Sequence, residues 1–88
     1  MATYRIEWKA SALKELKHLD RKIVARVISA VDSLSANPFP SGVRKLQGAD
    51  KTYRVRAGEY RIIYEVIHER IVIVIVRVRH RKDVYKQR

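Results

Sequence analysis

Residues 52–80 read TYRVRAGEYRIIYEVIHERIVIVIVRVRH, and this stretch decides the fold. Apolar side chains recur at every second position through Thr52–Ala57 and again through Glu59–Ile67. A period of two is typical of β-strands that bury one face. Ile71–Arg79 gives a third strand after a turn at 68–70, and connections this short predict an antiparallel meander.

The last of these strands is apolar on both faces from Ile71 to Val76. A strand of this kind is typically central in its sheet and covered on both sides. Helices from the first half of the chain can cover one side, but no further segment is left for the other. We therefore expect a protein partner to cover the second side.

A strand and a short helix precede the meander. Tyr4, Ile6 and Trp8 alternate with charged residues, which predicts a half-buried strand. From Ser11 the period changes to that of a helix. The apolar positions of this helix are Leu13, Leu16 and Leu19.

A second helix follows, with Asp20 as its expected N-cap. Its apolar stripe at helical spacing consists of Ile23, Val24, Val27, Ile28, Val31 and Leu34. The helix should end near Ala36, because the Asn37–Gly42 loop contains two prolines and a glycine. The short connection between the two helices predicts a helical hairpin.

The expected fold class is therefore α+β, with an N-terminal strand, a two-helix hairpin and an antiparallel meander packed on the helices. A chain of 88 residues suffices for one domain, which we place at 1–88. The absence of cysteine excludes a disulfide scaffold, thiolate zinc sites and a cysteine nucleophile. The charged, alternating N-terminus does not resemble a signal peptide, and the longest aliphatic run is too short to cross a bilayer. We expect a cytoplasmic protein that does not bind membranes.

The positive charge is concentrated in the second half of the chain. Residues 1–43 carry 7 Lys and Arg against 4 Asp and Glu, whereas residues 44–88 carry 13 against 5, so the net charges are +3 and +8. Nine of those 13 cations are arginines, whose planar guanidinium suits bidentate phosphate contacts. The distribution indicates a surface for a polyanion.

The strand periods place several arginines together. Arg54 and Arg56 share one face of their strand, and Arg61 shares a face with Ile63. On the last strand, Arg77 and Arg79 should share a face with Ile75. The helices are expected to cover the side formed by Tyr53, Val55, Ile62, Tyr64 and Val74. The arginines would then converge on the opposite side.

This set of residues excludes some chemistries and favours others. A metal-dependent nuclease needs two or more carboxylates to hold Mg²⁺, and this face has no such cluster. The three histidines, His18, His68 and His80, share no zinc-ligand spacing, so we expect neither a metal nor a cofactor. Fixed cations suit phosphodiester chemistry without a metal, since they stabilise negative charge developing on phosphorus. Simple binding of backbone phosphates remains the alternative.

Four segments in order carry a resemblance to a known family: KLQG (45–48), YRVR (53–56), EYRIIYEV (59–66) and VRHRKDVY (78–85). Together with the element order, they resemble the RelE/ParE toxins of type II toxin–antitoxin systems over essentially the whole chain. RelE-like members are ribosome-dependent endoribonucleases that cleave mRNA through the 2′-hydroxyl without metal. ParE-like members share the fold but poison DNA gyrase, and this activity is kept as the alternative.

The resemblance assigns roles to individual residues. Arg54, Arg56 and Arg61 would steady the scissile phosphate, while Arg81 would lie beside the leaving oxygen. The expected catalytic residues are Arg54, Arg56, Arg61, His80, Arg81 and Tyr85, and the expected RNA-binding or phosphate-binding residues are Lys45, Lys51, Arg77, Arg79 and Lys82.

Two positions depart from the family pattern. Arg56 stands where the family has a lysine that is proposed as general base, and a guanidinium does not lose its proton at useful pH. His80 or Tyr85 would then accept the 2′-hydroxyl proton, although His80 could also be a surface residue and Tyr85 an edge of the core. Glu59 is expected to be a turn residue, with a role as carboxylate base left open. Arg79 replaces a small residue and could change the shape of the cleft.

The resemblance also implies partners. A cognate RelB-like antitoxin would wrap the toxin, neutralise the basic cleft and supply the missing cover over the apolar strands. The other expected partners are the ribosomal decoding site and its mRNA. Operator DNA would be bound only through the toxin–antitoxin complex. A plain nucleic-acid-binding module or an inactive relative remains a further reading.

Overall fold

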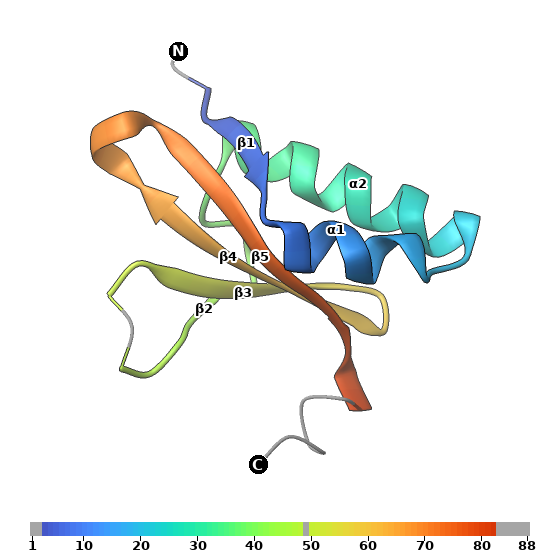
Figure 1. Ribbon diagram of the computed structural model, residues 1–88. Coiled ribbons are helices and arrows are strands. Elements are labelled where there is room, and N and C mark those ends of the chain that lie inside the picture. The colour runs from blue at the N-terminus through green and yellow to red at the C-terminus, as the bar shows by residue number, and fades with distance from the viewer. Residues whose placement is uncertain (1–2, 49, 83–88) are drawn as a thin grey trace.

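The computed structural model describes residues 3–48 and 50–82 of the chain. A five-stranded sheet in the order β1-β5-β4-β3-β2 packs against two helices (Figure 1). The elements are β1 (Arg5–Trp8), α1 (Ala10–Lys17), α2 (Arg21–Ala36), β2 (Arg44–Lys45), β3 (Thr52–Ala57), β4 (Tyr60–Ile67), the short 3₁₀ helix η1 (His68–Arg70) and β5 (Val72–His80). The α+β class and the antiparallel β3–β4–β5 meander are confirmed.

Two features of the sheet were not predicted. β1 joins it beside β5 in parallel, from the pair Arg5–Val72 to the pair Trp8–Ile75, so that β5 has a strand on each side. β2 is a strand of only two residues, Arg44 and Lys45, paired antiparallel with β3. A strand this short has no period from which a sequence pattern can be read.

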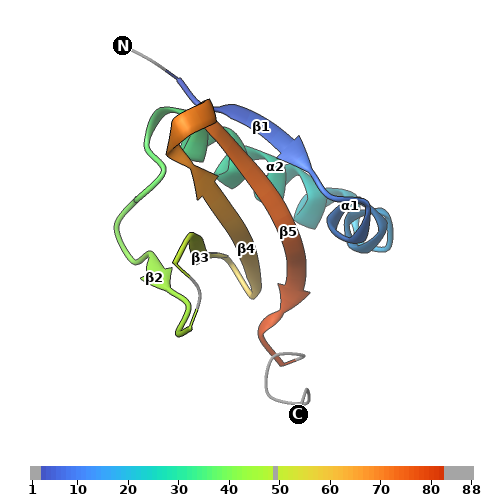
Figure 2. The same cartoon turned by 60° about the vertical axis from the view of Figure 1, so that its left-hand side comes forward.

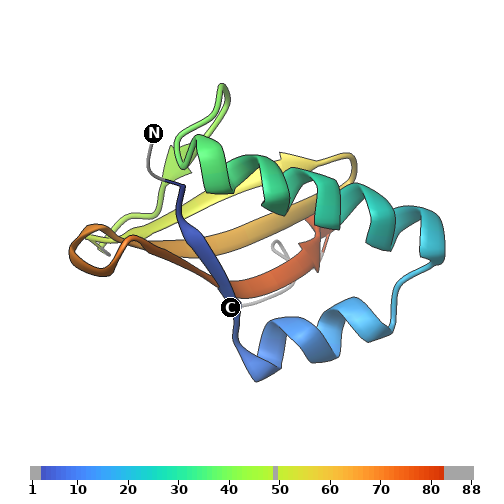
Figure 3. The same cartoon turned by 90° about the horizontal axis from the view of Figure 1, so that it is seen from above.

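Both helices lie on the same face of the sheet. In Figure 2 the strands lie in front of α2, and in Figure 3, seen from above, α2 crosses the sheet while α1 follows β5. Asp20 occupies the N-cap position of α2 as predicted, but its backbone carbonyl accepts the Val24 N–H (2.8 Å) and its side chain makes no capping bond. Within the part of the chain that the structure describes, neither helix is long and apolar enough to span a membrane.

The core lies between the helices and the sheet. Its largest fully buried side chains include Tyr64, Ile62, Ile73 and Ile75 from the sheet and Leu34 from α2. Burying a side chain such as Ile75 contributes about 1.5–3 kcal/mol. The core therefore rests on the predicted faces of β3 and β4, whereas on β5 it uses Ile73 and Ile75 in place of the predicted Val74.

The buried side chain of Tyr64 carries a hydroxyl group into this core. The Tyr64 hydroxyl donates a 2.6 Å hydrogen bond to the Pro38 carbonyl, which ties β4 to the loop after α2. Burial, reinforced by the neighbouring Tyr53 phenol, raises the pKa of Tyr64 to about 12. The phenol therefore stays neutral and keeps donating this hydrogen bond at pH values above 10.0, the ordinary pKa of a tyrosine.

A β-bulge in β5 overturns two predictions about faces. Tyr64 pairs with Ile75, but Ile63 pairs with Arg77, so β5 holds one extra residue, Val76, at this point. An extra residue moves everything beyond it to the other face of the strand. The prediction that Ile75 shares a face with Arg77 and Arg79 is therefore wrong, because Ile75 is in the core and both arginines lie on the outer side.

The prediction that Val74 faces the helices is wrong for a related reason. Ile73 and Ile75 both belong to the core, so alternation puts Val74 on the outer face opposite Glu65. Val72 on that outer face is buried, whereas Val74 and Val76 are half-buried. The expected cover by a protein partner stays a prediction.

Candidate nucleic-acid interface

The strand register brings six arginines to the outer face of the sheet. Arg56 pairs with Arg61, which pairs with Arg79 on the next strand. In the next row of the same face, two residues along each strand, Ile63 lies between Arg54 and Arg77. The two-residue strand β2 extends this second row, because Arg44 pairs with Arg54. We call this surface the arginine face; its arginines are Arg44, Arg54, Arg56, Arg61, Arg77 and Arg79.

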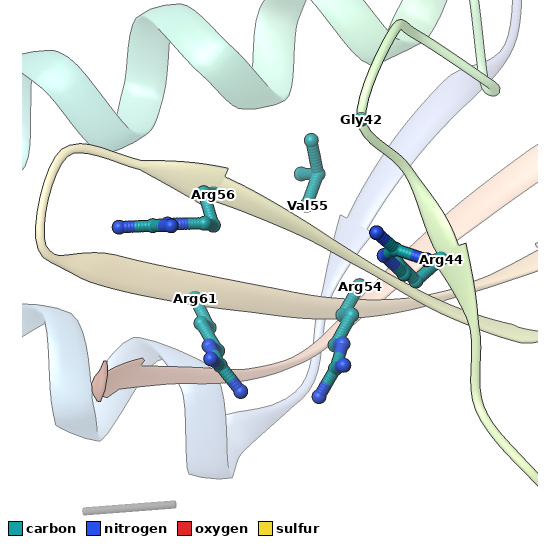
Figure 4. A pocket seen from close by; sticks show the side chains of 6 residues that line it. All are labelled: Gly42, Arg44, Arg54, Val55, Arg56 and Arg61. Carbon is teal, nitrogen blue, oxygen red and sulfur yellow. The ribbon is translucent and has the colours of Figure 1, made fainter. Parts of the chain in front are cut away.

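Part of the arginine face is a hollow of about 320 Å³, here called the arginine pocket. It is lined by Gly42, Arg44, Arg54, Val55, Arg56 and Arg61 (Figure 4). Figure 4 shows Arg54 and Arg61 extending in the same direction from neighbouring strands, while Val55 points to the opposite side, toward α2. Arg56 extends to one side in this view, but all three arginines that were predicted to converge, Arg54, Arg56 and Arg61, line the same hollow.

Arg44 is a pocket residue that sequence reasoning missed. It precedes the KLQG segment and lies in a strand too short to show alternation. Gly42 brings the chain to it through a turn with φ of +85°, a conformation that favours glycine. The available signal was the adjacent pair Arg44 and Lys45, directly after this turn.

The pocket has a strongly positive environment. No carboxylate lines it, and among residues 3–48 and 50–82 no Asp or Glu oxygen lies within 4 Å of the charged groups of Arg44, Arg54 or Arg56. Like charges on directly opposed strand positions repel each other, as in the pair Arg44–Arg54. An anion bound in the pocket would relieve this repulsion. The arrangement can therefore hold phosphate and stabilise additional negative charge on it.

Arg77 and Arg79 have a different environment, although they belong to the same face. Both interact with one carboxylate, that of Glu15 on α1, at 3.3 Å from Arg77 Nη1 and 3.1 Å from Arg79 Nε. Neither arginine lines the arginine pocket. The structure thus divides the arginine face into a pocket and a pair of arginines that shares the Glu15 carboxylate.

Arg81 lies at the hairpin end of the arginine face. Its backbone N–H donates a 2.8 Å hydrogen bond to the Glu59 carbonyl, and its Nη1 lies 3.7 Å from Glu59 Oε1. Glu59 is in the β3–β4 turn. Arg56 and Arg61 face each other in the second residue pair from this turn. The turn therefore holds Arg81 at the same end of the sheet as two pocket arginines.

His80 is not brought to the pocket. It pairs with Tyr60 on the core side of the sheet, where the two ring centroids are 5.1 Å apart. It lines a separate cleft of about 240 Å³, together with Glu15 and His18 of the α1 region. His80 Nδ1 accepts the Lys82 N–H at 3.1 Å, so the lone pair at this nitrogen is engaged and the proton of the neutral ring is on Nε2.

The remaining predicted residues are spread around the pocket. Lys45 lines a second hollow of about 400 Å³ that shares Arg44 and Arg54 with the arginine pocket. Lys51 precedes β3 and lines neither hollow, and Lys82 is exposed directly after Arg81. Tyr85 lies outside the described residues. In residues 3–48 and 50–82, no three His, Asp or Glu side chains gather as metal ligands.

Comparison with known proteins agrees with this geometry. Residues 6–85 match the family model of the ParE toxin of the type II toxin–antitoxin system parDE. Because the match spans most of the chain, the chain belongs to the RelE/ParE family of type II toxins.

Similar proteins within that family include RelG and RelE toxins. Toxin RelG of Mycobacterium tuberculosis is 32% identical over 85 residues, covering 96% of this chain and 98% of that protein. The mRNA interferase toxin RelE of Escherichia coli K12 is 27% identical over 88 residues, covering 96% and 92%. The crystal structure of an archaeal RelE–RelB complex from Pyrococcus horikoshii OT3 matches with a TM-score of 0.80 and 33% identity, covering 90% of this chain and 96% of that chain. The RelE-like fold is confirmed.

Proposed function

We propose that this RelE-like toxin is a ribosome-dependent mRNA endonuclease whose arginine pocket holds the scissile phosphate. The observation that carries the proposal is that arginines from β2, β3 and β4 line one hollow, to which residues 3–48 and 50–82 contribute no carboxylate. A relative of 27% identity bears the name mRNA interferase, which supports the same reading. A phosphodiester in a decoding ribosome fits a pocket of this charge.

The proposed reaction is a transfer within the RNA. The 2′-oxygen forms a bond to phosphorus, the bond from phosphorus to the 5′-oxygen breaks, and a 2′,3′-cyclic phosphate results. The 2′-hydroxyl proton passes to a base, and the leaving 5′-oxygen takes up a proton. Arg54, Arg56 and Arg61 stabilise the extra negative charge on phosphorus, and each such donor is worth about 10²–10³-fold in rate.

The proton transfers need groups other than these arginines, because a guanidinium does not deprotonate at useful pH. His80 is poorly placed as the base, since it lies on the core side with Nδ1 engaged by Lys82. Tyr85 therefore remains our candidate for the base. Arg81 is proposed to lie beside the leaving oxygen, where Glu59 supports its backbone and its side chain.

A RelB-like antitoxin is the proposed protein partner. Several of the similar solved structures are RelE–RelB complexes. The antitoxin would neutralise the arginine face and cover the half-buried Val74 and Val76 beside it. Binding to operator DNA would follow only from that complex.

The test uses ribosomes programmed with a defined mRNA and the full-length toxin. We expect cleavage in the ribosome-bound codon, with a 5′-hydroxyl on the downstream fragment. A matched mRNA with a 2′-deoxy nucleotide at the cleavage site should remain intact, because it lacks the attacking group. Cleavage of that deoxy mRNA would contradict the proposed chemistry.

Gyrase inhibition is the alternative outcome, and the matching family model is named for ParE. A supercoiling assay with purified gyrase at the same toxin concentrations distinguishes the two activities. Intact mRNA together with blocked supercoiling would replace the nuclease proposal. We expect cleaved mRNA and unchanged supercoiling.

A further inference from the structure

A single carboxylate on α1 organises the end of β5. Glu15 Oε1 accepts the Val78 backbone N–H at 2.8 Å. Its other oxygen, Oε2, accepts from Arg79 Nε at 3.1 Å and from Arg77 Nη1 at 3.3 Å. The Glu15 side chain is mostly shielded from solvent, and that of Arg79 is only 17% exposed. We call these four residues the Glu15 cluster.

The cluster takes the place of a strand. β1 ends at Trp8, opposite Ile75, so the edge of β5 beyond that point has no strand partner on this side. The side chains of α1 fill the gap, because Ser11 Oγ donates to the Val76 carbonyl at 2.9 Å and Glu15 accepts the Val78 N–H. These bonds satisfy backbone groups at an edge that would otherwise fray.

The bulge makes this support necessary. Val76 is the extra residue of β5, and the three residues after it carry the contacts to Glu15. Past the cluster, the chain reaches Arg81, whose N–H bonds the Glu59 carbonyl. The direction in which β5 leaves the sheet is therefore fixed from two sides, by α1 through Glu15 and by the β3–β4 turn through Glu59.

We propose that Glu15 is a positioning residue of the site, which holds the end of β5 so that Arg81 reaches the scissile phosphate. The role in cleavage rests on the proposed nuclease function. Arg77 and Arg79 serve this cluster, since their guanidinium groups are bound to the carboxylate. The RNA is then held by the arginine pocket.

Two substitutions separate the parts of the cluster. Glu15→Gln keeps an amide oxygen that can accept the Val78 N–H but removes the charge that binds the two arginines. Glu15→Ala removes both functions. Asp32→Asn is the matched control, because it makes the same change in net charge at an exposed position on α2.

The first measurement is amide hydrogen exchange in the folded protein, which does not depend on any activity. Glu15→Ala should accelerate exchange of the Arg81 amide about tenfold or more, and Glu15→Gln should accelerate it less. Arg81 does not contact Glu15, so a purely local role would change the Val78 amide alone. If the Arg81 amide exchanges at the wild-type rate in both variants, the positioning role is wrong.

The second measurement is single-turnover cleavage on programmed ribosomes over a range of toxin concentrations. Glu15→Gln should lower the rate at saturation about tenfold, while the half-saturating concentration stays equal or falls because the protein has gained positive charge. Asp32→Asn should keep the wild-type rate. A Glu15→Gln defect confined to the half-saturating concentration would overturn the proposal.

The two measurements distinguish a failure of the proposed function from a failure of the positioning role. A wild-type protein that cleaves no mRNA contradicts the proposed function, and the exchange of the Arg81 amide still decides whether Glu15 holds this segment. If Glu15→Ala does not fold, Glu15→Gln decides both questions. Wild-type cleavage together with wild-type Arg81 exchange in Glu15→Gln would reject the positioning role.

Discussion

The two faces of the β3–β4–β5 sheet are built from the same strands and have opposite physical characters. On the helix side, Ile62, Tyr64 and Ile75 are fully buried. On the other side, arginines face each other across strands, as in the pair Arg56–Arg61. Alternation along a strand places one residue on each face in turn, so a single hairpin supplies both. The buried face stabilises the fold, whereas the pocket arginines of the other face repel one another and oppose folding, but they form a site that attracts phosphate.

The arginine face itself contains two environments. Arg54 and Arg56 line a pocket that has no carboxylate from the described part of the chain, whereas Arg77 and Arg79 bind Glu15. We therefore expect substitutions in the pocket to affect cleavage directly, and substitutions in the Glu15 cluster to affect stability and, through the position of Arg81, the cleavage rate. The buried face should respond to neither anions nor salt.

The largest expected effect is on cleavage. Arg56→Ala should slow cleavage of ribosome-bound mRNA about 10²–10³-fold, because it removes a cation that stabilises charge on phosphorus. Arg5→Ala is the control, since Arg5 is an exposed arginine on β1 that pairs with Glu7 and should leave the rate within threefold. A rate for Arg56→Ala that stays within threefold of wild type would break the distinction between pocket and surface arginines.

The next largest expected effect is a loss of stability at high pH, caused by a tyrosine of the buried face. The pKa of Tyr64 is raised to about 12 in the folded protein from 10.0, so its contribution to stability is complete below pH 10. That contribution is lost as the pH rises from 10 through about 12, and the shift corresponds to about 2–3 kcal/mol. Urea unfolding between pH 7 and 12 measures it.

Tyr64→Phe should remove this alkaline loss of stability. It should also lower the free energy of unfolding at pH 7 by about 1–3 kcal/mol, since the Pro38 carbonyl loses its donor. Tyr4→Phe, which alters a hydroxyl bonded to His68 at the edge of the sheet, should keep the alkaline loss. An unchanged alkaline transition in Tyr64→Phe would exclude this phenol as its cause.

A smaller effect distinguishes the Glu15 cluster from the pocket. Arg79→Ala should lower the free energy of unfolding by about 1–2 kcal/mol, because a shielded carboxylate loses a hydrogen-bond donor. Arg77→Ala should cost less, since the Arg77 side chain is 42% exposed. Urea titrations of both variants give the two values. No cost in either variant would indicate that the cluster does not support β5.

The smallest expected effect is a gain in stability. Arg44→Thr should raise the free energy of unfolding by about 0.2–1 kcal/mol, because it removes a like charge directly opposite Arg54. Threonine also suits a strand position. The difference from wild type should shrink when phosphate is added, since a bound anion relieves the same repulsion. A loss of stability in Arg44→Thr would contradict the idea that the pocket arginines oppose folding.

Much of the fold could be predicted from strand and helix periods. The three long strands and the end of α2 at Ala36 follow from alternation and from the loop prolines. The bulge at Val76 could not be predicted, because it depends on how β5 pairs with β4 and leaves no mark in an uninterrupted apolar run. The errors on Val74 and Ile75 both come from applying a strict period of two to this strand.

Strand periods also predicted part of the candidate site. Arg54, Arg56 and Arg61 converge as their period requires. His80 was expected beside them, but it directly follows Arg79, so alternation places it on the core side with Tyr60. Arg44 was missed because its two-residue strand shows no period, and Glu15 was missed because it contacts Val78 across 63 positions, which a local pattern does not contain.

The parallel pairing of β1 with β5 has a consequence for how the protein is made. Arg5 and Val72 are neighbours in the sheet but stand 67 positions apart in the chain. At about 5–20 residues per second, the ribosome needs about 3–13 s to synthesise the stretch between them. During that time β1 has no β5 to pair with, and Glu15 has no Val78 N–H from which to accept its hydrogen bond. The sheet and its cationic surface are thus completed at the same late moment of translation.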